Sequence, residues 1–183
     1  MNLISKEEND LIYELVVNIE KYKNINSKNF IFGPYNHHVQ VYCDYSHINM
    51  KGVTPCNFFK NKAVVYLAFT KDNESNFGKT MDFGQRLNDY SKDIRNQTKR
   101  NKNHSMYKSA KRLGEIYFIP IMCRDFSSFP DGRKEAEEWA RQCERLLHER
   151  ERAIGNRTSN ILIWIYTKIY LLTQNFKLWK LKS

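Results

Sequence analysis

The stretch VVYLAFTKDNESNFGKTMDFGQRLNDY, residues 64–90, carries the local signals on which the predicted fold rests. Residues 63–70 are rich in β-branched and aromatic side chains, which favours a strand. The polar run DNES after this strand is typical of a turn, and a second, short strand ends near Gly78. Asp82 is a suitable N-cap for a helix over residues 83–95. The stretch therefore predicts a β-hairpin that leads directly into a helix.

Apolar periodicity predicts further helices on both sides of this hairpin. Apolar residues recur every three or four positions over residues 6–23 and again over 134–152, so each segment has one apolar face. Gly114 marks the end of another helix over residues 105–113. We therefore expect three helices in addition to the one that follows the hairpin.

Two other segments have strand character. Residues 115–123 are rich in aromatic and β-branched residues, and Pro120 within them favours an edge strand or a bulge. Residues 37–45 alternate in part between polar and apolar side chains and are a further strand candidate. The predicted fold class is α/β (α+β), a small three-stranded sheet flanked by helices, with strands near 63–70, 76–79 and 115–123.

The length and composition are those of a globular protein. The chain has 183 residues, of which 41% are hydrophobic and 27% charged. We expect an N-terminal extension over residues 1–60, made of a helix and a candidate strand, a main domain over 61–160, and an apolar and basic tail over 161–183. The apolar run at 161–172 is shorter than the roughly 20 residues that a membrane-spanning helix needs, so we expect it to be buried.

The formal net charge of +10 and the isoelectric point near 9.4 indicate a polyanionic partner. Nucleic acid or an anionic membrane surface fits this balance. The cysteines form no C-x-x-C pair, and the spacing of Cys43, His47 and Cys56 matches no zinc finger. The N-terminal sequence lacks the pattern of a secretory signal. We therefore expect an intracellular protein, cytoplasmic or nuclear, with free thiols.

Cationic and phenolic side chains gather in the hairpin and the helix after it. Arg86 and Tyr90 lie four residues apart and so share one helix face, and Tyr66 and Lys79 lie on the strands just before. Hydrolysis of a phosphodiester needs an activated water and positive charge around the phosphorane. A guanidinium suits the second task, and a phenol whose pKa is lowered by nearby cations suits the first. Such residues are also common on ordinary helices, so alone they leave the function open.

A carboxylate of the last predicted helix is a candidate metal ligand. Glu144 lies about 100° around the helix from the centre of the apolar face, at the border of the buried stripe. Glu137 and Glu151 share this border position, so periodicity alone does not choose among the three. Mg²⁺ usually keeps several waters and takes one or two protein carboxylates, which a residue of this kind can supply.

The residues of the hairpin and its helix resemble the signature of the GIY-YIG nucleases. Tyr66 matches the first motif, written VVY here in place of GIY. The tripeptide Asn76-Phe77-Gly78 falls where the family has Tyr-x-Gly. Arg86 follows at the family's spacing of ten residues after Asn76, and Tyr90 stands where the family has His or Tyr.

The resemblance extends over about residues 62–160 and implies roles for individual residues. Glu144, two residues before an aliphatic pair and followed later by Asn156, resembles the family's metal-binding glutamate and its asparagine, and this selects Glu144 from the three glutamates. By resemblance, Tyr66 activates water, Arg86 contacts the phosphate and Glu144 holds one Mg²⁺ or Mn²⁺ ion.

Two positions depart from the family pattern. Asn76 stands where the second motif has a tyrosine, and an amide cannot act as an acid or a base. Lys79 compensates for this loss in charge only, and Val64 replaces the first glycine. We therefore expect a supporting role, rather than a part in the chemistry, for Asn76, Gly78, Lys79 and Asn156.

The basic segment over residues 92–112 is a candidate nucleic-acid contact. Cationic side chains of this kind give salt-dependent, sequence-independent affinity for phosphates. His104 and Tyr107 add rings that can stack on bases. A solvated loop is the alternative. The cations of the segment are Lys92, Arg95, Lys99, Arg100, Lys102, Lys108, Lys111 and Arg112.

Together these observations favour a divalent-metal-dependent DNA endonuclease of GIY-YIG type, closest to the restriction and mobile-element branches. The alternative is a catalytically degenerate protein of the same type that binds nucleic acid without cutting it, and Asn76 favours this alternative. A third hypothesis is a membrane-surface protein that uses the tail and the positive charge. The sequence leaves open the target site, the choice between DNA and RNA, and whether the protein is a homodimer.

Overall fold

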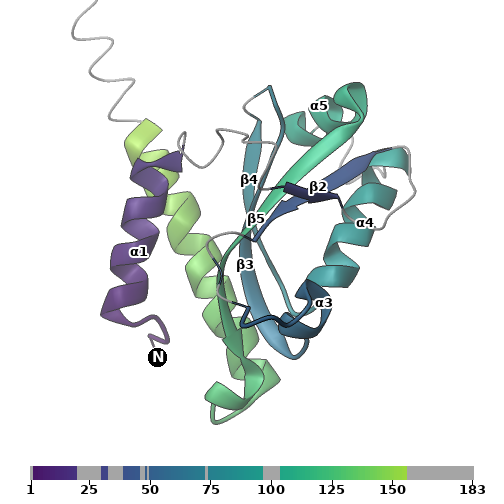
Figure 1. Cartoon of the computed structure of the whole chain (residues 1–183). Coiled ribbons are helices and arrows are strands. Elements are labelled where there is room, and N and C mark those ends of the chain that lie inside the picture. Colours follow the sequence, from purple (N-terminus) through teal and green to yellow (C-terminus); the bar gives the residue numbers. More distant parts are fainter. Residues whose placement is uncertain are drawn as a thin grey trace, which may run out of the picture. The chain divides into compact units, whose positions relative to one another are not determined.

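The computed structural model shows a mixed α/β protein in which helices cover a twisted sheet (Figure 1). The chain divides into two units, Met1–Leu147 and His148–Ser183, which are described separately. In the second unit residues 148–155 are helical, and Nδ1 of His148 lies 3.7 Å from Oε2 of Glu151. The structure describes residues 2–19, 30–32, 39–45, 48, 50–72, 74–96 and 104–155.

Most helices and strands lie where the sequence predicts them. The hairpin, the helix after it and the helix before Gly114 are confirmed, whereas the first helix is described only as far as residue 19. In chain order the elements are α1 (Lys6–Val17), β1 (Phe30–Phe32), β2 (Gln40–Asp44), α3 (Pro55–Phe58), β3 (Lys62–Phe69), β4 (Ser75–Thr80), α4 (Phe83–Asn96), α5 (Ser105–Leu113), β5 (Glu115–Asp125), the 3-10 helix η1 (Phe126–Ser128), and a helix over residues 133–155.

The sheet has five strands in the order β1-β2-β5-β3-β4, so the prediction of three strands was wrong. The strands β2 and β5 run parallel, and the other neighbours are antiparallel. The two additional strands come from the segment that we assigned to an N-terminal extension. Because β2 pairs with β5 over residues 40–43, this segment is part of the same sheet.

Pro120 lies at a β-bulge, as the sequence predicts. Val65 pairs with Met122, but the next residue, Tyr66, pairs with Pro120, so Ile121 is the extra residue of the bulge. The strand itself is not at the edge of the sheet, because β5 lies between β2 and β3.

Gly114 allows α5 to end and β5 to begin within one residue. Its φ angle of 72° is in the left-handed region, which glycine adopts without strain. The Gly114 N–H donates to the carbonyl of Ala110, and its own carbonyl accepts from the N–H of Gln40 at 2.7 Å. The glycine therefore joins the end of α5 to the start of the β2–β5 pair.

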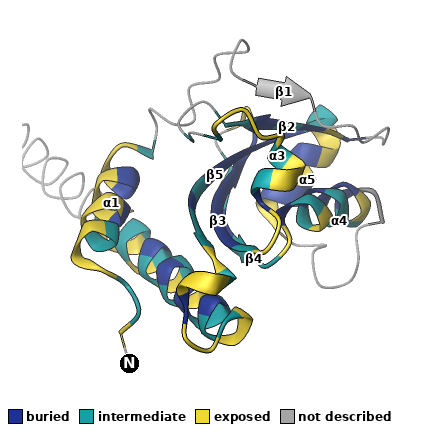
Figure 2. Cartoon of the chain, turned by 60° about the horizontal axis from the view of Figure 1, so that its bottom comes forward, coloured by how far each residue is buried: buried dark blue, intermediate teal, exposed yellow. Residues whose placement is uncertain are grey.

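One face of the sheet packs against α4 and α5, and Figure 2 shows the buried residues that line it. Alternate residues of a strand point to the same face, so Val64, Tyr66 and Ala68 of β3 contribute together to one buried cluster. From α4 and α5 this cluster takes Phe83, Leu87, Tyr90, Ile94, Met106, Tyr107 and Ala110.

The helix over residues 133–147 covers the other face. Lys79 of β4 pairs with Val65, so its side chain points away from the face that carries Tyr66. The Lys79 Nζ atom lies 3.3 Å from Oε1 of Glu137, which belongs to this helix. The helix residues that are buried have the three- and four-residue spacing that the sequence predicts, and they are Ala136, Trp139, Ala140, Cys143 and Leu147.

Glu8 both starts α1 and connects it to the 133–147 helix. One carboxylate oxygen accepts from the Ser5 N–H at 2.9 Å, and the Ser5 hydroxyl accepts from the Glu8 N–H, which together form a capping box. The other oxygen accepts from the indole N–H of Trp139 at 3.2 Å and lies 3.8 Å from Arg124. The Glu8 side chain therefore stabilises both the start of α1 and the attachment of α1 to the helix over residues 133–147.

Substitution of Gly78 should destabilise the protein, because the Tyr66 ring occupies the space that a side chain would need. A Cβ atom at Gly78 would lie 2.5 Å from both Cζ and the hydroxyl oxygen of Tyr66, whose ring is 1% exposed. We expect Gly78→Ala to lower the free energy of unfolding by about 1–3 kcal/mol, measured by urea denaturation.

Gly84→Ala is the matched control for this substitution. Its Cβ would meet only Oδ1 of Asp82, at 3.7 Å, and alanine favours a helix over glycine by up to about 1 kcal/mol. The control should therefore be as stable as the wild type or more so. If Gly78→Ala were as stable as the control, the close contact between Gly78 and the Tyr66 ring would be contradicted.

Candidate functional site

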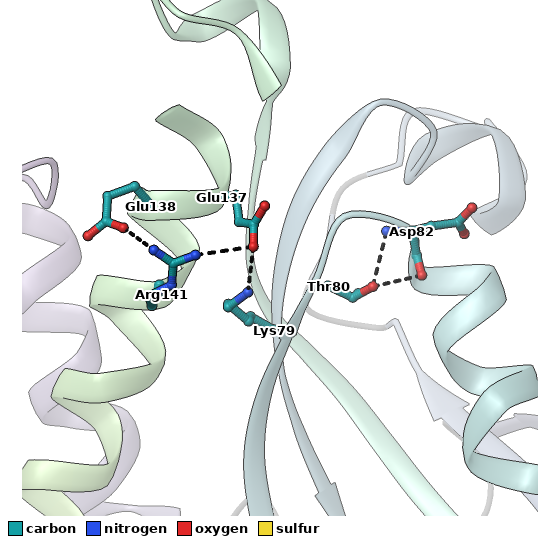
Figure 3. Close-up of polar contacts among 6 residues, drawn as sticks. All are labelled: Lys79, Thr80, Asp82, Glu137, Glu138 and Arg141. Carbon is teal, nitrogen blue, oxygen red and sulfur yellow. Dashed lines mark hydrogen bonds and ion pairs between the residues drawn. The ribbon is translucent and has the colours of Figure 1, made fainter. Parts of the chain in front are cut away.

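The turn from β4 into α4 fixes the position of Arg86. The Asp82 carboxylate accepts from the N–H of Gln85 at 2.9 Å, which confirms the predicted cap. The Thr80 hydroxyl accepts from the Asp82 N–H at 3.0 Å and donates to the Asp82 carbonyl at 2.9 Å, as Figure 3 shows. Arg86, whose N–H donates to the Asp82 carbonyl, therefore lies in a well-anchored first turn.

The Arg86 side chain lies between two phenols, as the sequence predicts. Its Nε–H donates to the Tyr66 hydroxyl at 2.9 Å, and its guanidinium carbon lies 4.3 Å from the centre of the Tyr90 ring. Burial opposes the charge, but the two phenols more than offset this, so the pKa of Arg86 is raised. Among the described residues, the two terminal nitrogens of this half-buried guanidinium have no hydrogen-bond or ion-pair partner.

Tyr66 is buried and keeps its proton. Only 1% of the residue is exposed, and this burial raises the pKa of the phenol, with a further contribution from Tyr90. The charge and hydrogen bond of Arg86 act in the opposite direction but are smaller. A pKa lowered by cations, which the sequence suggested, is therefore wrong for Tyr66. The phenol is a hydrogen-bond acceptor that orients Arg86 at neutral pH.

Tyr90 and Tyr107 belong to the core rather than to the surface. Tyr90 is 1% exposed and Tyr107 is 6% exposed, and their rings stack at 5.4 Å. Tyr107 therefore cannot stack on a base in this conformation, which corrects our expectation, whereas His104 is exposed. The apolar spacing of Met106, Tyr107 and Ala110 was the signal in the sequence that Tyr107 faces inward.

The two remaining residues of β4 that we singled out lie on different faces. Asn76 is half-buried and pairs with Ala68, so it shares the face of Tyr66. Lys79 is on the other face, where it pairs with Glu137, and Glu137 also pairs with Arg141 at 3.2 Å (Figure 3). The expectation that Lys79 adds charge near Arg86 is therefore wrong, because its charge lowers the pKa of Glu137 instead.

Glu144 and Arg86 come from helices on opposite faces of the sheet. Glu144 is partly exposed and follows Glu137 by seven residues, so both lie on one flank of the helix, about 10 Å apart along its axis. Glu137 reaches Lys79 on β4, which is the edge strand, so this flank faces that edge. No hydrogen bond or ion pair within the described residues joins Glu144 to Arg86. A ligand in contact with both side chains would therefore have to extend around the edge of the sheet.

The predicted nucleic-acid contacts are described in part. Lys92, Lys108 and Lys111 are exposed on α4 and α5, which pack against each other. Arg112 is exposed and forms an ion pair with Asp72. The side chain of Arg95 and the residues Lys99, Arg100, Lys102 and Asn156 lie outside the described residues.

Polar contacts attach α5 to the hairpin, and the sequence did not predict them. The buried Ser109 hydroxyl bonds to the Thr70 hydroxyl at 2.9 Å and to the Asp72 carboxylate at 2.5 Å. Ser105 donates to Glu74 at 2.5 Å. Asp72, Glu74, Ser105 and Ser109 line a shallow pocket, and their hydrogen bonds hold α5 against the turn between β3 and β4.

Comparisons of the chain with known proteins found no matching family model, no matching curated protein and no matching solved structure. Within the described residues, no helix combines the length and apolarity needed to span a bilayer. The apolar run at 161–172 lies outside these residues. Also within them, no three His, Cys, Asp or Glu side chains gather as a metal cluster.

The buried phenols should make the protein less stable in alkali. Burial raises the pKa of Tyr66 above its ordinary value of 10.0, so the folded state keeps a proton that the unfolded chain loses. This contribution to stability is complete below pH 10 and is lost as the pH rises further. We expect the free energy of unfolding to fall between about pH 10 and pH 11, and to fall less steeply in Tyr66→Phe.

Urea denaturation at a series of pH values measures this slope. Tyr13→Phe is the control for the loss of a phenol that is not buried, because 55% of Tyr13 is exposed. A Tyr66→Phe variant that loses stability as steeply as the wild type would contradict the assignment.

Proposed function

We propose that this protein binds nucleic acid through its phosphates, with Arg86 as the central contact. The observation that carries the proposal is the arrangement of Arg86 itself. Tyr66 accepts from its Nε–H and Tyr90 lies beneath its plane, whereas its two terminal nitrogens have no partner among the residues that the structure describes. A guanidinium offers a planar fork of donors that matches phosphate oxygens.

The surrounding charge supports the same proposal. Lys92, Lys108 and Lys111 are exposed on the two helices that cover the Arg86 face, and the chain as a whole has a formal net charge of +10. Contacts from such side chains bind phosphates independently of sequence and weaken with salt. We therefore propose DNA as the partner, with α4 and α5 lying against its backbone.

Loss of the Arg86 guanidinium should weaken DNA binding more than loss of a cation elsewhere. We expect Arg86→Gln to bind a labelled duplex roughly tenfold or more weakly, because it loses a charge-assisted hydrogen bond. The dependence of log K on log salt should also become shallower by about one. Fluorescence anisotropy over a salt series measures both quantities.

Lys134→Ala is the matched control, because Lys134 is exposed on the helix that covers the other face. Equal affinities for the Arg86 and Lys134 variants would overturn the role of Arg86. Binding to anionic vesicles but not to DNA would overturn the proposal in favour of the membrane-surface hypothesis.

The second candidate is a divalent-metal-dependent endonuclease of GIY-YIG type. The observation that favours it is the contact among three residues of the resemblance, since the Tyr66 ring lies over Gly78 and the Tyr66 hydroxyl accepts from the Arg86 Nε–H. Asn76 in place of a tyrosine and the burial of Tyr66 favour binding without cleavage.

A metal ion would depend on Glu144 in this candidate function. Its carboxylate is partly exposed and has no partner among the described residues, which fits an ion that takes one or two protein carboxylates and keeps its waters. Bound Mg²⁺ or Mn²⁺ would supply charge for the leaving oxygen. Arg86 would bind the phosphate, and Tyr66 would orient Arg86.

Nicking of a supercoiled plasmid tests this candidate directly. Cleavage should require Mg²⁺ or Mn²⁺ and should fall by at least about 100-fold in Glu144→Gln, with DNA binding unchanged. Glu135→Gln is the control, because Glu135 lies on the opposite flank of the same helix. Absence of cleavage in the wild type, or equal cleavage by both variants, would leave binding as the function.

We also propose an intracellular location. All four cysteines are free, and Cys43 and Cys143 are buried. Burial raises the pKa of each of these two thiols to about 12, so both stay protonated and unreactive. Free thiols are usual in a reducing compartment.

A further inference from the structure

The position of the Arg86 guanidinium depends on the ring beneath it. Its carbon lies 4.3 Å from the centre of the Tyr90 ring, so a tilt or shift of this ring moves the charge and strains the bond from Nε to Tyr66. Tyr90 is 1% exposed and is surrounded by other rings. The contacts that fix the orientation of the Tyr90 ring therefore also fix the position of the Arg86 guanidinium.

Three rings from three different elements hold Tyr90. Tyr66 of β3 meets it edge-on at 6.2 Å, and Phe118 of β5 meets it edge-on at 5.0 Å. Tyr107 of α5 lies nearly parallel to it, at 5.4 Å and an angle of 19°. The two strand residues are fixed by the sheet, whereas the parallel contact depends on where α5 lies.

The position of α5 is itself set by the hairpin. Ser109 bonds to Thr70 and to Asp72, and Arg112 pairs with the same carboxylate. Ser109 comes two residues after Tyr107 on the helix, so these bonds fix the backbone that carries the ring. The same helix presents Lys108 and Lys111 to the exterior.

We infer that Tyr107 is a positioning residue for Arg86 and acts through the stacked ring of Tyr90. The inference extends the proposed function, because it takes Arg86 as the phosphate contact. The helix α5 then contributes in two ways. Its exposed lysines face the exterior, and its buried Tyr107 positions Arg86 through the Tyr90 ring. A shift of α5 would then move the Tyr90 ring and, with it, the Arg86 guanidinium.

Hydrogen exchange at the Arg86 side chain tests this role without any nucleic acid. The Nε–H signal is assigned by its loss in Arg86→Lys and followed by ¹⁵N NMR. In Tyr107→Leu, which removes the ring, we expect exchange at least about tenfold faster than in the wild type. In Tyr107→Phe, which keeps the ring, we expect exchange within about twofold of the wild type.

Tyr117→Leu is the control for loss of a buried ring. Tyr117 is 4% exposed, similar to Tyr107, but it lies on the opposite face of the sheet from the α4–α5 cluster. Exchange in Tyr107→Leu no faster than in this control would overturn the inference. If Tyr107→Leu does not fold, Tyr107→Met replaces it, because methionine also lacks the ring, and wild-type exchange in that variant would overturn the inference equally.

DNA affinity separates the inference from the function on which it rests. We expect Tyr107→Leu to bind DNA about tenfold more weakly and Tyr107→Phe to restore wild-type affinity. If Tyr107→Leu speeds exchange and Tyr107→Phe does not, while Arg86→Gln binds DNA normally, the proposed function fails and the positioning role stands. If Arg86→Gln weakens binding and Tyr107→Leu leaves both exchange and affinity unchanged, the positioning role fails alone.

Discussion

The hydrogen bond from Arg86 to the Tyr66 hydroxyl is the interaction on which the site depends. It joins the first turn of α4 to β3, an interior strand that lies between β5 and β4. It forms only because Gly78 leaves room for the Tyr66 ring above β4. A buried phenol next to a guanidinium satisfies the polar atoms of both, which would otherwise be costly to remove from water. A charged side chain is thereby held at the border of a hydrophobic core, and none of the described residues bonds to its two terminal nitrogens.

Much of the fold could be predicted because its signals are local. The cap at Asp82, the glycine that ends α5 and the bulge at Pro120 each depend on residues that are neighbours in the sequence. The five-stranded sheet could not be predicted in this way. The alternation over residues 37–45 correctly indicated β2, but its place in the sheet depends on parallel pairing with β5, more than 70 residues later in the chain. Such pairing depends on tertiary contacts that no short window of sequence contains.

The sequence predicted which residues form the site, but it did not predict how deeply they are buried. The four-residue spacing of Arg86 and Tyr90 correctly brought them together, and the strand before them supplied Tyr66. Burial could not be read from spacing, and it reversed the expected direction of the Tyr66 pKa. Strand alternation, applied to β4 once its register is known, places Lys79 on the face opposite Gly78 and explains why its charge serves Glu137. The position of Glu144 relative to Arg86 depends on which face of the sheet each helix covers, and a single sequence does not contain this information.

The attachment of α1 has a consequence for how the chain folds during synthesis. The bond from Trp139 to Glu8 joins residues 131 positions apart, and that from Leu3 to Gln142 joins residues 139 apart. At typical translation rates the ribosome needs on the order of ten seconds to make the residues in between. During that interval α1 has only its capping box and its own helical bonds, and an isolated helix of this length is marginal in water. Its docking is therefore a late step, and until then the apolar face of α1 is open to chaperones.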